Sequence, residues 1–178
     1  MCGARSAPEE APRWTSVTRD GPSTLEIRTF LDEPVRPAQV ASVSPSGLPV
    51  LGSFWFVFEG GRFWFSSRLN TPLTIAVAHG SEVAVLVDDF TPPNSIRQVR
   101  IRGVGKVESH DPSRVERIYR RYLGNSLAEW PDFFRARLTD PTWALWSVTP
   151  SSGLAVTSPS FEPVEIRWQD PSASPLPR

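Results

Sequence analysis

The sequence predicts a mainly β domain with flanking helices, of the α+β class. Two runs rich in aromatic and β-branched residues, 48–58 and 62–67, are joined by a short link with two glycines, a pattern typical of a β-hairpin. Further strand-like runs follow, separated by segments with helical periodicity. The 178 residues are 39% hydrophobic, with seven Trp and ten Phe, and a chain of this length buries roughly two thirds of its unfolded surface. One domain with a substantial core is therefore expected.

The aromatic hairpin is the most informative stretch. Its first run is apolar at even and odd positions alike, as in Phe54, Trp55 and Phe56. Both faces of this strand are therefore expected to be covered, as in a barrel wall that lies against another surface. A flat aromatic ligand and a second subunit are the two alternatives for that surface.

Two elements are predicted before the hairpin. Ser23 and Glu26 have the spacing of a capping box, which predicts a short helix over 23–32 that the following prolines end. Residues 39–44 alternate between polar and small apolar side chains, and a turn signature at 45–47 follows them. Together with the hairpin, this segment predicts three successive antiparallel strands.

The elements after the hairpin alternate between helix and strand. Asn70 or Thr71 is expected to cap a helix that Gly80 ends. The remaining predicted elements are strands over 82–87, 95–108 and 143–148 and helical segments over 111–124 and 126–138. Segments 154–156 and 164–168 have shorter strand patterns, and the two ends, 1–22 and 169–178, are expected to be flexible tails around a domain over 23–168.

Composition excludes several function classes. Nineteen basic residues balance nineteen acidic ones, so no overall field favours nucleic acid or an anionic membrane. Cys2 is the only cysteine, so an internal disulfide or a cysteine-based metal site is excluded. His79 and His110 lack a third residue spaced for a metal site. No apolar run has the length of a signal peptide core or a membrane helix, and a cytoplasmic location is expected.

Several motifs occur in the order and spacing of a known family. They are a turn at 45–47, Pro49, the Trp55-Phe56 pair, Phe65-Ser66-Ser67, a helix, a strand over 83–89, the run Arg97-Gln98-Val99-Arg100-Ile101-Arg102-Gly103 and a helix over 114–124. In this series, residues 23–148 resemble the pyridoxamine 5'-phosphate oxidase-like FMN-binding split-barrel superfamily, in particular its flavin and deazaflavin oxidoreductase branch.

The resemblance implies a six-stranded antiparallel split β-barrel that forms a homodimer, with cofactor sites at the subunit interface. It implies FMN as the cofactor, or in this branch the deazaflavin coenzyme F-420. By position, Phe54 and Trp55 would face the ring system and Gln98 would contact the cofactor. Ser66, Ser67 and Thr71 would offer hydroxyl groups to the phosphate, beside the start of a helix.

One departure from the family pattern concerns the phosphate. Where the family has Ser-Arg-Lys, this chain has Thr71-Pro72-Leu73, so both cationic side chains are replaced. Each charge-assisted hydrogen bond lost forgoes roughly 1.5 to 3 kcal/mol. Arg68, Arg100 and Arg102 are the arginines that could compensate. FMN, the deazaflavin coenzyme and no cofactor all remain open.

The predicted function is a flavin- or deazaflavin-dependent oxidoreductase acting on a small organic substrate. No acid–base or nucleophilic constellation stands out, which is consistent with an enzyme whose cofactor supplies the chemistry. The alternative is a non-catalytic split-barrel paralogue that binds another small ligand or serves as a structural dimer. The Pro72-Leu73 replacement is the feature that favours this alternative.

Overall fold

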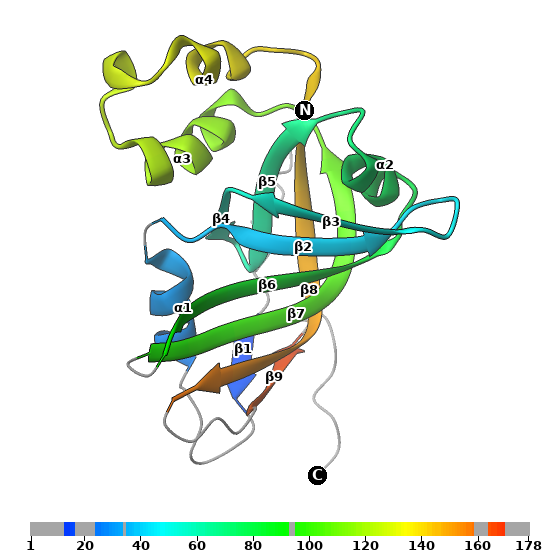
Figure 1. Cartoon of the computed structure of the whole chain (residues 1–178), viewed down its shortest axis with the longest axis vertical. Helices are drawn as coiled ribbons and strands as arrows, with labels where there is room; N and C mark the ends of the chain where they lie inside the picture. The colour runs from blue at the N-terminus through cyan, green and yellow to red at the C-terminus, as the bar shows by residue number, and fades with distance from the viewer. Residues whose placement is uncertain (1–12, 17–23, 34, 93–94, 159–163, 170–178) are drawn as a thin grey trace, which may run out of the picture.

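The computed structural model describes residues 13–16, 24–33, 35–92, 95–158 and 164–169. These residues form nine strands and four α-helices (Figure 1). The strands are β1 (Arg13–Ser16), β2 (Ala38–Val43), β3 (Pro49–Phe54), β4 (Phe56–Glu59), β5 (Arg62–Arg68), β6 (Glu82–Thr91), β7 (Ser95–Glu108), β8 (Trp143–Thr157) and β9 (Val164–Gln169). The helices are α1 (Thr24–Asp32), α2 (Pro72–Ala78), α3 (Pro112–Leu123), the 3-10 helix η1 (Leu127–Glu129) and α4 (Asp132–Arg137).

All nine strands belong to one antiparallel sheet. Its main order is β1-β9-β8-β7-β6-β2-β3, and β5 pairs with both β8 and β4. The ladder does not close on itself, because β3 is paired only with β2 and β4 only with β5. β3 and β4 are nevertheless successive segments of the chain, interrupted at Trp55. Between β3 and β4 the barrel wall is therefore continued by the chain itself, through Trp55, and not by a ladder of hydrogen bonds, as in a split barrel.

The six strands expected from the sequence become nine, and each difference has a local cause. The predicted strand over 48–58 divides at Trp55, so only β4 forms the expected hairpin with β5, while β3 pairs with β2. β1 lies inside the expected tail 1–22, where no strand was predicted. Its partner β9 covers 164–169 and corresponds to the short strand pattern at 164–168. Apart from these strands, both expected tails lie outside the described residues.

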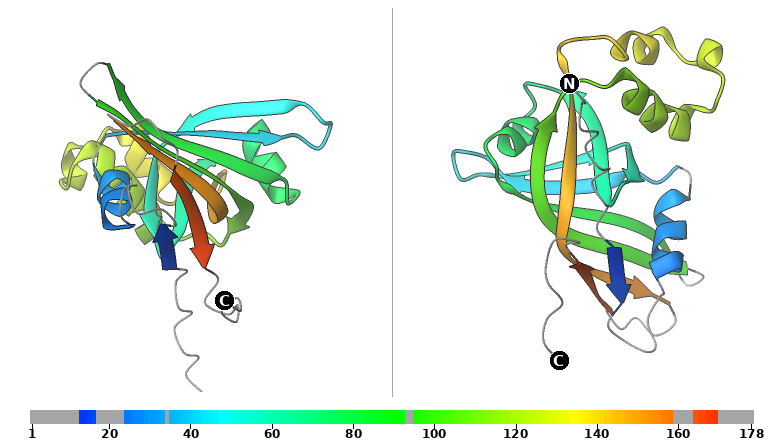
Figure 2. Two further views of the ribbon diagram at one scale, coloured as in Figure 1. Left: turned by 90° about the horizontal axis from the view of Figure 1, so that it is seen from below. Right: turned by 180° about the vertical axis from the view of Figure 1, so that it is seen from behind.

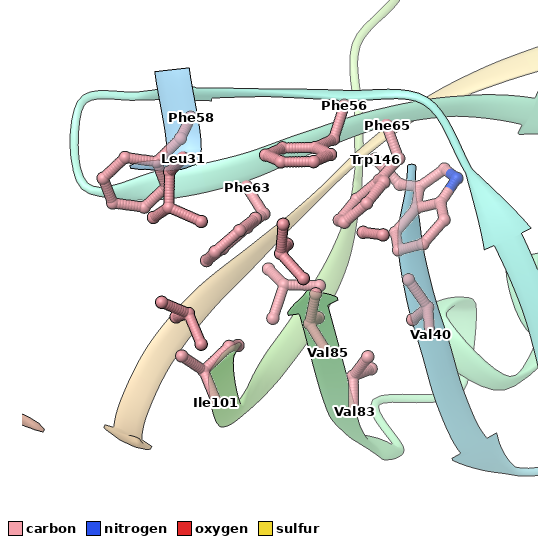
Figure 3. Close-up of a cluster of buried hydrophobic side chains, with 14 of the residues drawn as sticks. Leu31, Val40, Phe56, Phe58, Phe63, Phe65, Val83, Val85, Ile101 and Trp146 are labelled. Atoms are coloured by element: carbon pink, nitrogen blue, oxygen red, sulfur yellow. The ribbon is translucent and has the colours of Figure 1, made fainter. Parts of the chain in front are cut away.

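The main core fills the curved sheet between α1 and α2, which lie at opposite sides of it (Figure 2). Phe30 and Leu31 of α1 and Leu73 and Val77 of α2 are all buried in this one cluster. The largest buried side chains around them are aromatic. Figure 3 shows how Phe56, Phe63, Phe65 and Trp146 lie beside Val40, Val83, Val85 and Ile101.

A second, smaller core lies outside the barrel wall, where α3 packs against β4 and β5 and α4 lies beside α3 (Figure 1). Val115, Ile118 and Tyr119 of α3 are buried there, together with Trp130 and Leu145. The stripe of apolar residues at helical spacing in 111–124 is explained by this packing.

The predicted cap of α2 is confirmed, whereas Ser23 of the capping box predicted for the first helix lies outside the described residues. Thr71 caps α2, because its Oγ1 accepts a hydrogen bond from the Thr74 amide, and Asp111 caps α3 in the same way. The helical segment expected over 126–138 is not continuous. It divides into η1 and α4 because Pro131 has no amide hydrogen to donate within a helix.

Four charged side chains join α1 to the ends of β6 and β7. Arg97 donates to Glu33 over 2.7 Å and to Asp89 over 2.8 Å, and Arg36 contacts both carboxylates. The guanidinium groups of Arg36 and Arg97 also lie over the ring of Phe30. Hydrogen bonds from Arg97 lower the pKa values of Glu33 and Asp89. The cluster fixes the helix that closes this side of the core.

Candidate functional site

The hydroxyl groups predicted to hold a phosphate bond mainly to one another. Ser67 is buried, and its Oγ accepts the Trp146 indole N–H over 2.9 Å and shares a hydrogen bond of 2.7 Å with Thr74. Thr74 in turn bonds to Thr71, which already caps α2. The structure therefore brings Ser67 and Thr71 together, but as parts of an internal network that ties α2 to β5 and β8.

Ser66 lies on the opposite face of β5, because successive side chains in a strand alternate. Its buried Oγ faces the buried hydroxyl of Tyr119 on α3, close enough to offset part of the rise that burial causes in the pKa of that phenol, and neither atom has another hydrogen-bond partner among the described residues. Arg68 shares this face by the same alternation, so it points away from Ser67 and Thr71. The two serines thus do not converge on one ligand.

These observations test whether the hydroxyl set fits the phosphate of a flavin cofactor. Ser67 and Thr71 have their bonding capacity used by protein partners, and Leu73, in place of a family cation, is buried in the core. Arg68 faces the other way. The junction between the β4–β5 hairpin and α2, where Ser67 and Thr71 lie, is called the hairpin–helix junction below. It does not fit a dianionic phosphate, because such a phosphate needs donors that are free and preferably charged.

The two aromatic residues expected to face a cofactor ring are engaged in packing. Phe54 contacts Phe65 and Trp146 edge to face within the core, at centroid distances of 6.3 and 5.5 Å. The half-buried indole of Trp55 is stacked on Tyr122 and on Phe134, at centroid distances of 4.8 and 5.0 Å. Its ring contacts therefore lie with α3 and α4.

Gln98 is the predicted residue that lies beside an open site. It projects from β7 on the face that also presents Arg100 and Arg102, and Arg100 donates a hydrogen bond to its Oε1. This face is the outer surface of the sheet. Sequence reasoning thus identified one row of the site from the alternation of polar residues along β7.

A groove of about 660 Å³ crosses this outer face from β3 to β8. Paired register positions place its floor and walls side by side: Ala41 lies opposite Leu51 and Ala84, and Ala84 lies opposite Arg102. The groove is lined by Gln39, Ala41, Leu51, Ala84, Val85, Leu86, Arg100, Ile101, Arg102, Ser152, Gly153 and Leu154.

The groove has an apolar floor and two cationic side chains. The small side chains of Ala41 and Ala84 leave space that Leu51, Leu86 and Leu154 border. Arg100 and Arg102 are exposed, and neither forms an ion pair with a carboxylate in the described part of the chain. Such a surface suits a flat aromatic ligand with an anionic end.

The sequence did not identify the floor of the groove. Ala41, Leu51, Ala84 and Leu86 lie on three different strands, and only the pairing of β2 with β3 and β6 brings them together. The one available signal was a pair of small or apolar residues on the solvent side of each strand, Ala41 and Val43 in β2 and Ala84 and Leu86 in β6. On its own this pattern also fits an ordinary exposed strand.

Titratable groups give no sign of acid–base catalysis in the groove. Burial raises the pKa values of Tyr119 and Tyr122, but both lie in the second core beside Trp55. Within the described ranges, no group of three or more His, Cys, Asp or Glu residues is placed to hold a metal ion. The same residues include no helix with the length and hydropathy needed to span a bilayer.

Comparisons with known proteins agree with this architecture. The family model described as pyridoxamine 5'-phosphate oxidase matches residues 23–156, whereas no curated protein matches the chain. A conserved hypothetical protein, Rv2991 from Mycobacterium tuberculosis, has a similar structure, with a TM-score of 0.64, 20% identity and coverage of 79% of this chain and 89% of that one.

Two further solved structures show how widely the fold is used. An F420 reductase is 22% identical with a TM-score of 0.51, covering 71% of this chain and 94% of its own. HutZ, the heme storage protein from Vibrio cholerae, is 13% identical with a TM-score of 0.57, covering 71% and 89%. At these identities the likeness shows a shared fold only. Because the family model matches more than half of the chain, the protein belongs to the pyridoxamine 5'-phosphate oxidase family.

Proposed function

We propose that this protein is a homodimeric oxidoreductase that holds FMN or the deazaflavin coenzyme in the groove on the outer face of its sheet and acts on a small organic substrate. The observation that supports the proposal most is the groove itself, which combines an apolar floor with two arginines that pair with no carboxylate among the described residues. Family membership and the fold shared with an F420 reductase support the choice of cofactor class.

The dimensions of the groove suit a flat tricyclic ring. From β3 to β8 it crosses four inter-strand steps, or about 19 Å. Ala41 and Ala84 provide a flat floor, and the side chain of Gln39, which donates to Ser53 over 3.1 Å, supplies a polar group at one edge. A bound flavin would supply hydride-transfer chemistry, and this chain's own residues would bind it, orient it and exclude water.

A second copy of the chain is the proposed cover of the groove. Large apolar side chains remain exposed on and beside this face, including Leu51 at 75%, Val43 at 50% and Val104 at 56%. Contiguous exposed apolar surface of this kind commonly marks a protein interface. A two-fold dimer would bury these residues and would enclose a ligand between the two grooves.

One observation favours a second candidate function, a split-barrel protein that binds a different small ligand without catalysis. The hydroxyl groups expected at a flavin phosphate are satisfied inside the protein, through Ser67, Thr71 and Thr74. HutZ, which shares this fold, is a heme storage protein, so proteins with this fold also have roles other than flavin-dependent catalysis.

The test is direct binding to the purified full chain. A visible absorption spectrum, followed by fluorescence titration with FMN and with the deazaflavin coenzyme, is expected to show saturable binding of one of them at one molecule per protomer. Sedimentation in the same buffer is expected to give a dimer. A folded dimer that binds neither cofactor would reject the oxidoreductase proposal and leave the second candidate.

A further inference from the structure

We infer that Arg100 and Arg102 on β7 form the anion site of this protein, holding the phosphate-bearing tail of the ligand in place of the hairpin–helix junction. The inference rests on the proposed function for the identity of the ligand, but the site is defined by the arginines themselves. It assigns the negatively charged end of the ligand to the β7 end of the groove.

The geometry of β7 places the two guanidinium groups as a pair. Residues two apart on a strand project from the same face about 7 Å apart, so Arg100 and Arg102 can approach one phosphate from two sides. Gln98 accepts a hydrogen bond from Arg100 and so restricts its orientation. Arginine suits this role because its planar donor fork matches phosphate oxygens in pairs.

The lack of a carboxylate partner distinguishes the two residues from most other arginines in the described structure. Arg36, Arg97, Arg114, Arg117 and Arg120 each pair with carboxylates, mostly on a different element of the fold. No described carboxylate pairs with Arg100 or Arg102. Two neighbouring cations without counter-ions raise the local positive potential and favour an anion between them.

The surroundings of the pair increase the strength of such binding. Arg100 lies between Leu86 and Leu154 in the cross-strand register, and Arg102 lies between Ala84 and Ser152. Apolar neighbours, once covered by a ligand ring and a second copy, exclude water and strengthen a charge-assisted hydrogen bond.

Two carboxylates on the same face offer an alternative partner for the arginines. Glu82 and Asp88 of β6 lie one row beyond Arg102 and Arg100, opposite Val104 and Gln98 in the register. In a two-fold dimer, the partner's copies of these carboxylates could bind the arginines and leave no role for a ligand. The experiment therefore separates anion binding from dimer contact.

The experiment compares the wild type with the double variant Arg100→Gln/Arg102→Gln. FMN and riboflavin, which share a ring but differ in the phosphate, are titrated by flavin fluorescence, and inorganic pyrophosphate is tested by thermal shift. Lys106→Gln, on the same face of β7 outside the groove, and Arg68→Gln, at the rival position, are matched controls. Sedimentation and circular dichroism show whether each variant stays dimeric and folded.

The double variant is expected to bind FMN about a hundredfold more weakly, while its affinity for riboflavin changes less than about threefold. Pyrophosphate is expected to stabilise the wild type and both controls but not the double variant. If only Arg68→Gln weakens FMN, or if pyrophosphate stabilises the double variant as well as the wild type, the inference is overturned. A double variant that becomes monomeric yet keeps the pyrophosphate shift would assign the arginines to the dimer contact instead.

The outcomes for the ligand and for the anion site are distinguishable. If the wild type binds no flavin but shows a pyrophosphate shift that the double variant loses, the proposed function fails and the anion site stands. If flavin binds and the double variant keeps the preference for FMN over riboflavin, the proposed function stands and the anion site is wrong.

Discussion

Ser66 and Ser67 are adjacent in the chain, but their side chains project from opposite faces of β5 and have different partners. The Ser67 hydroxyl lies in the core and joins Trp146 to Thr74, whereas the Ser66 hydroxyl faces α3 and the hydroxyl of Tyr119. A motif comparison treats both as phosphate ligands because it records residue type and not direction. The alternation of side chains along β5 decides between them, and it depends on which face of β5 meets the core.

Ser67→Ala is expected to lower the free energy of unfolding by about 1 to 3 kcal/mol, because the buried indole N–H of Trp146 would lose its acceptor. Ser66→Ala is the matched control and is expected to cost less, since the Ser66 hydroxyl holds no indole N–H and its polar neighbour in the described part of the chain is the Tyr119 hydroxyl alone. Urea unfolding of both variants measures the difference. Equal losses would show that the bond from Trp146 to Ser67 adds no specific stability.

The residues that cover Trp55 could likewise not be predicted from the sequence. The sequence shows that both faces of the segment around it must be covered, and the structure confirms this, with Phe56, Val57 and Phe58 all buried. It does not show that a same-chain segment more than sixty residues later, carrying Tyr122 and Phe134, provides the cover. Contacts of such long range depend on the packed fold and not on local pattern.

At the scale of elements, α1 is held in place by an ion-pair cluster and by hydrogen bonds to its carbonyl oxygens. The first attachment is the half-buried cluster of Glu33, Arg36, Asp89 and Arg97. The second is Arg121 of α3, also half-buried, which donates to the carbonyl oxygens of Leu31 and Glu33. The two attachments respond differently to pH, because only the first contains carboxylates.

Arg97→Gln is expected to destabilise the protein in a pH-dependent way. Arg97 lowers the pKa values of Glu33 and Asp89 in the folded state, so its contribution is complete above their unfolded values of about 4 and is lost as the pH falls through the lower folded values. The difference in unfolding free energy between wild type and variant should therefore shrink below about pH 4. Chemical denaturation at several pH values measures it; a difference that stays constant into acid would contradict this assignment.

Arg121→Met is expected to lower the unfolding free energy by about 2 to 3 kcal/mol, because carbonyl oxygens in α1 and β4 lose a half-buried donor. Arg117→Met on the same helix removes an exposed ion pair with Glu59 and is expected to cost no more than about 1 kcal/mol. Equal effects in denaturant titrations would mean that Arg121 does not join α3 to α1.

At the scale of the whole molecule, the sequence predicted a mainly β fold with flanking helices and the cap of α2. It did not predict that β8 runs on through Pro150 to Thr157. The segment 149–153 resembles a turn, but Pro150 lies opposite Gly103 at a shift in register, where an amide hydrogen is not required. A Cβ at Gly103 would lie 2.1 Å from the Thr149 carbonyl oxygen, so the close approach of these strands requires glycine.

The candidate site was predictable only where it follows one strand. Gln98, Arg100 and Arg102 share a face of β7 by simple alternation, and Arg100 and Arg102 line the groove, whereas Gln98 is not among its lining residues. The floor formed by Ala41 and Ala84 requires the pairing of β2 with β6. Strand order in an antiparallel sheet with long connections is a property of the whole fold, which no local pattern specifies.

The claim that the outer groove is the ligand face is tested most directly by filling it. Flavin-fluorescence titration with FMN and the deazaflavin coenzyme would compare the wild type with Ala84→Phe on the groove floor and with Ala136→Phe at an exposed position of α4. The wild type and Ala136→Phe are expected to bind alike, and Ala84→Phe at least about tenfold more weakly, because the added ring occupies the space of the ligand. Undiminished binding by folded Ala84→Phe would contradict the account and place the ligand elsewhere.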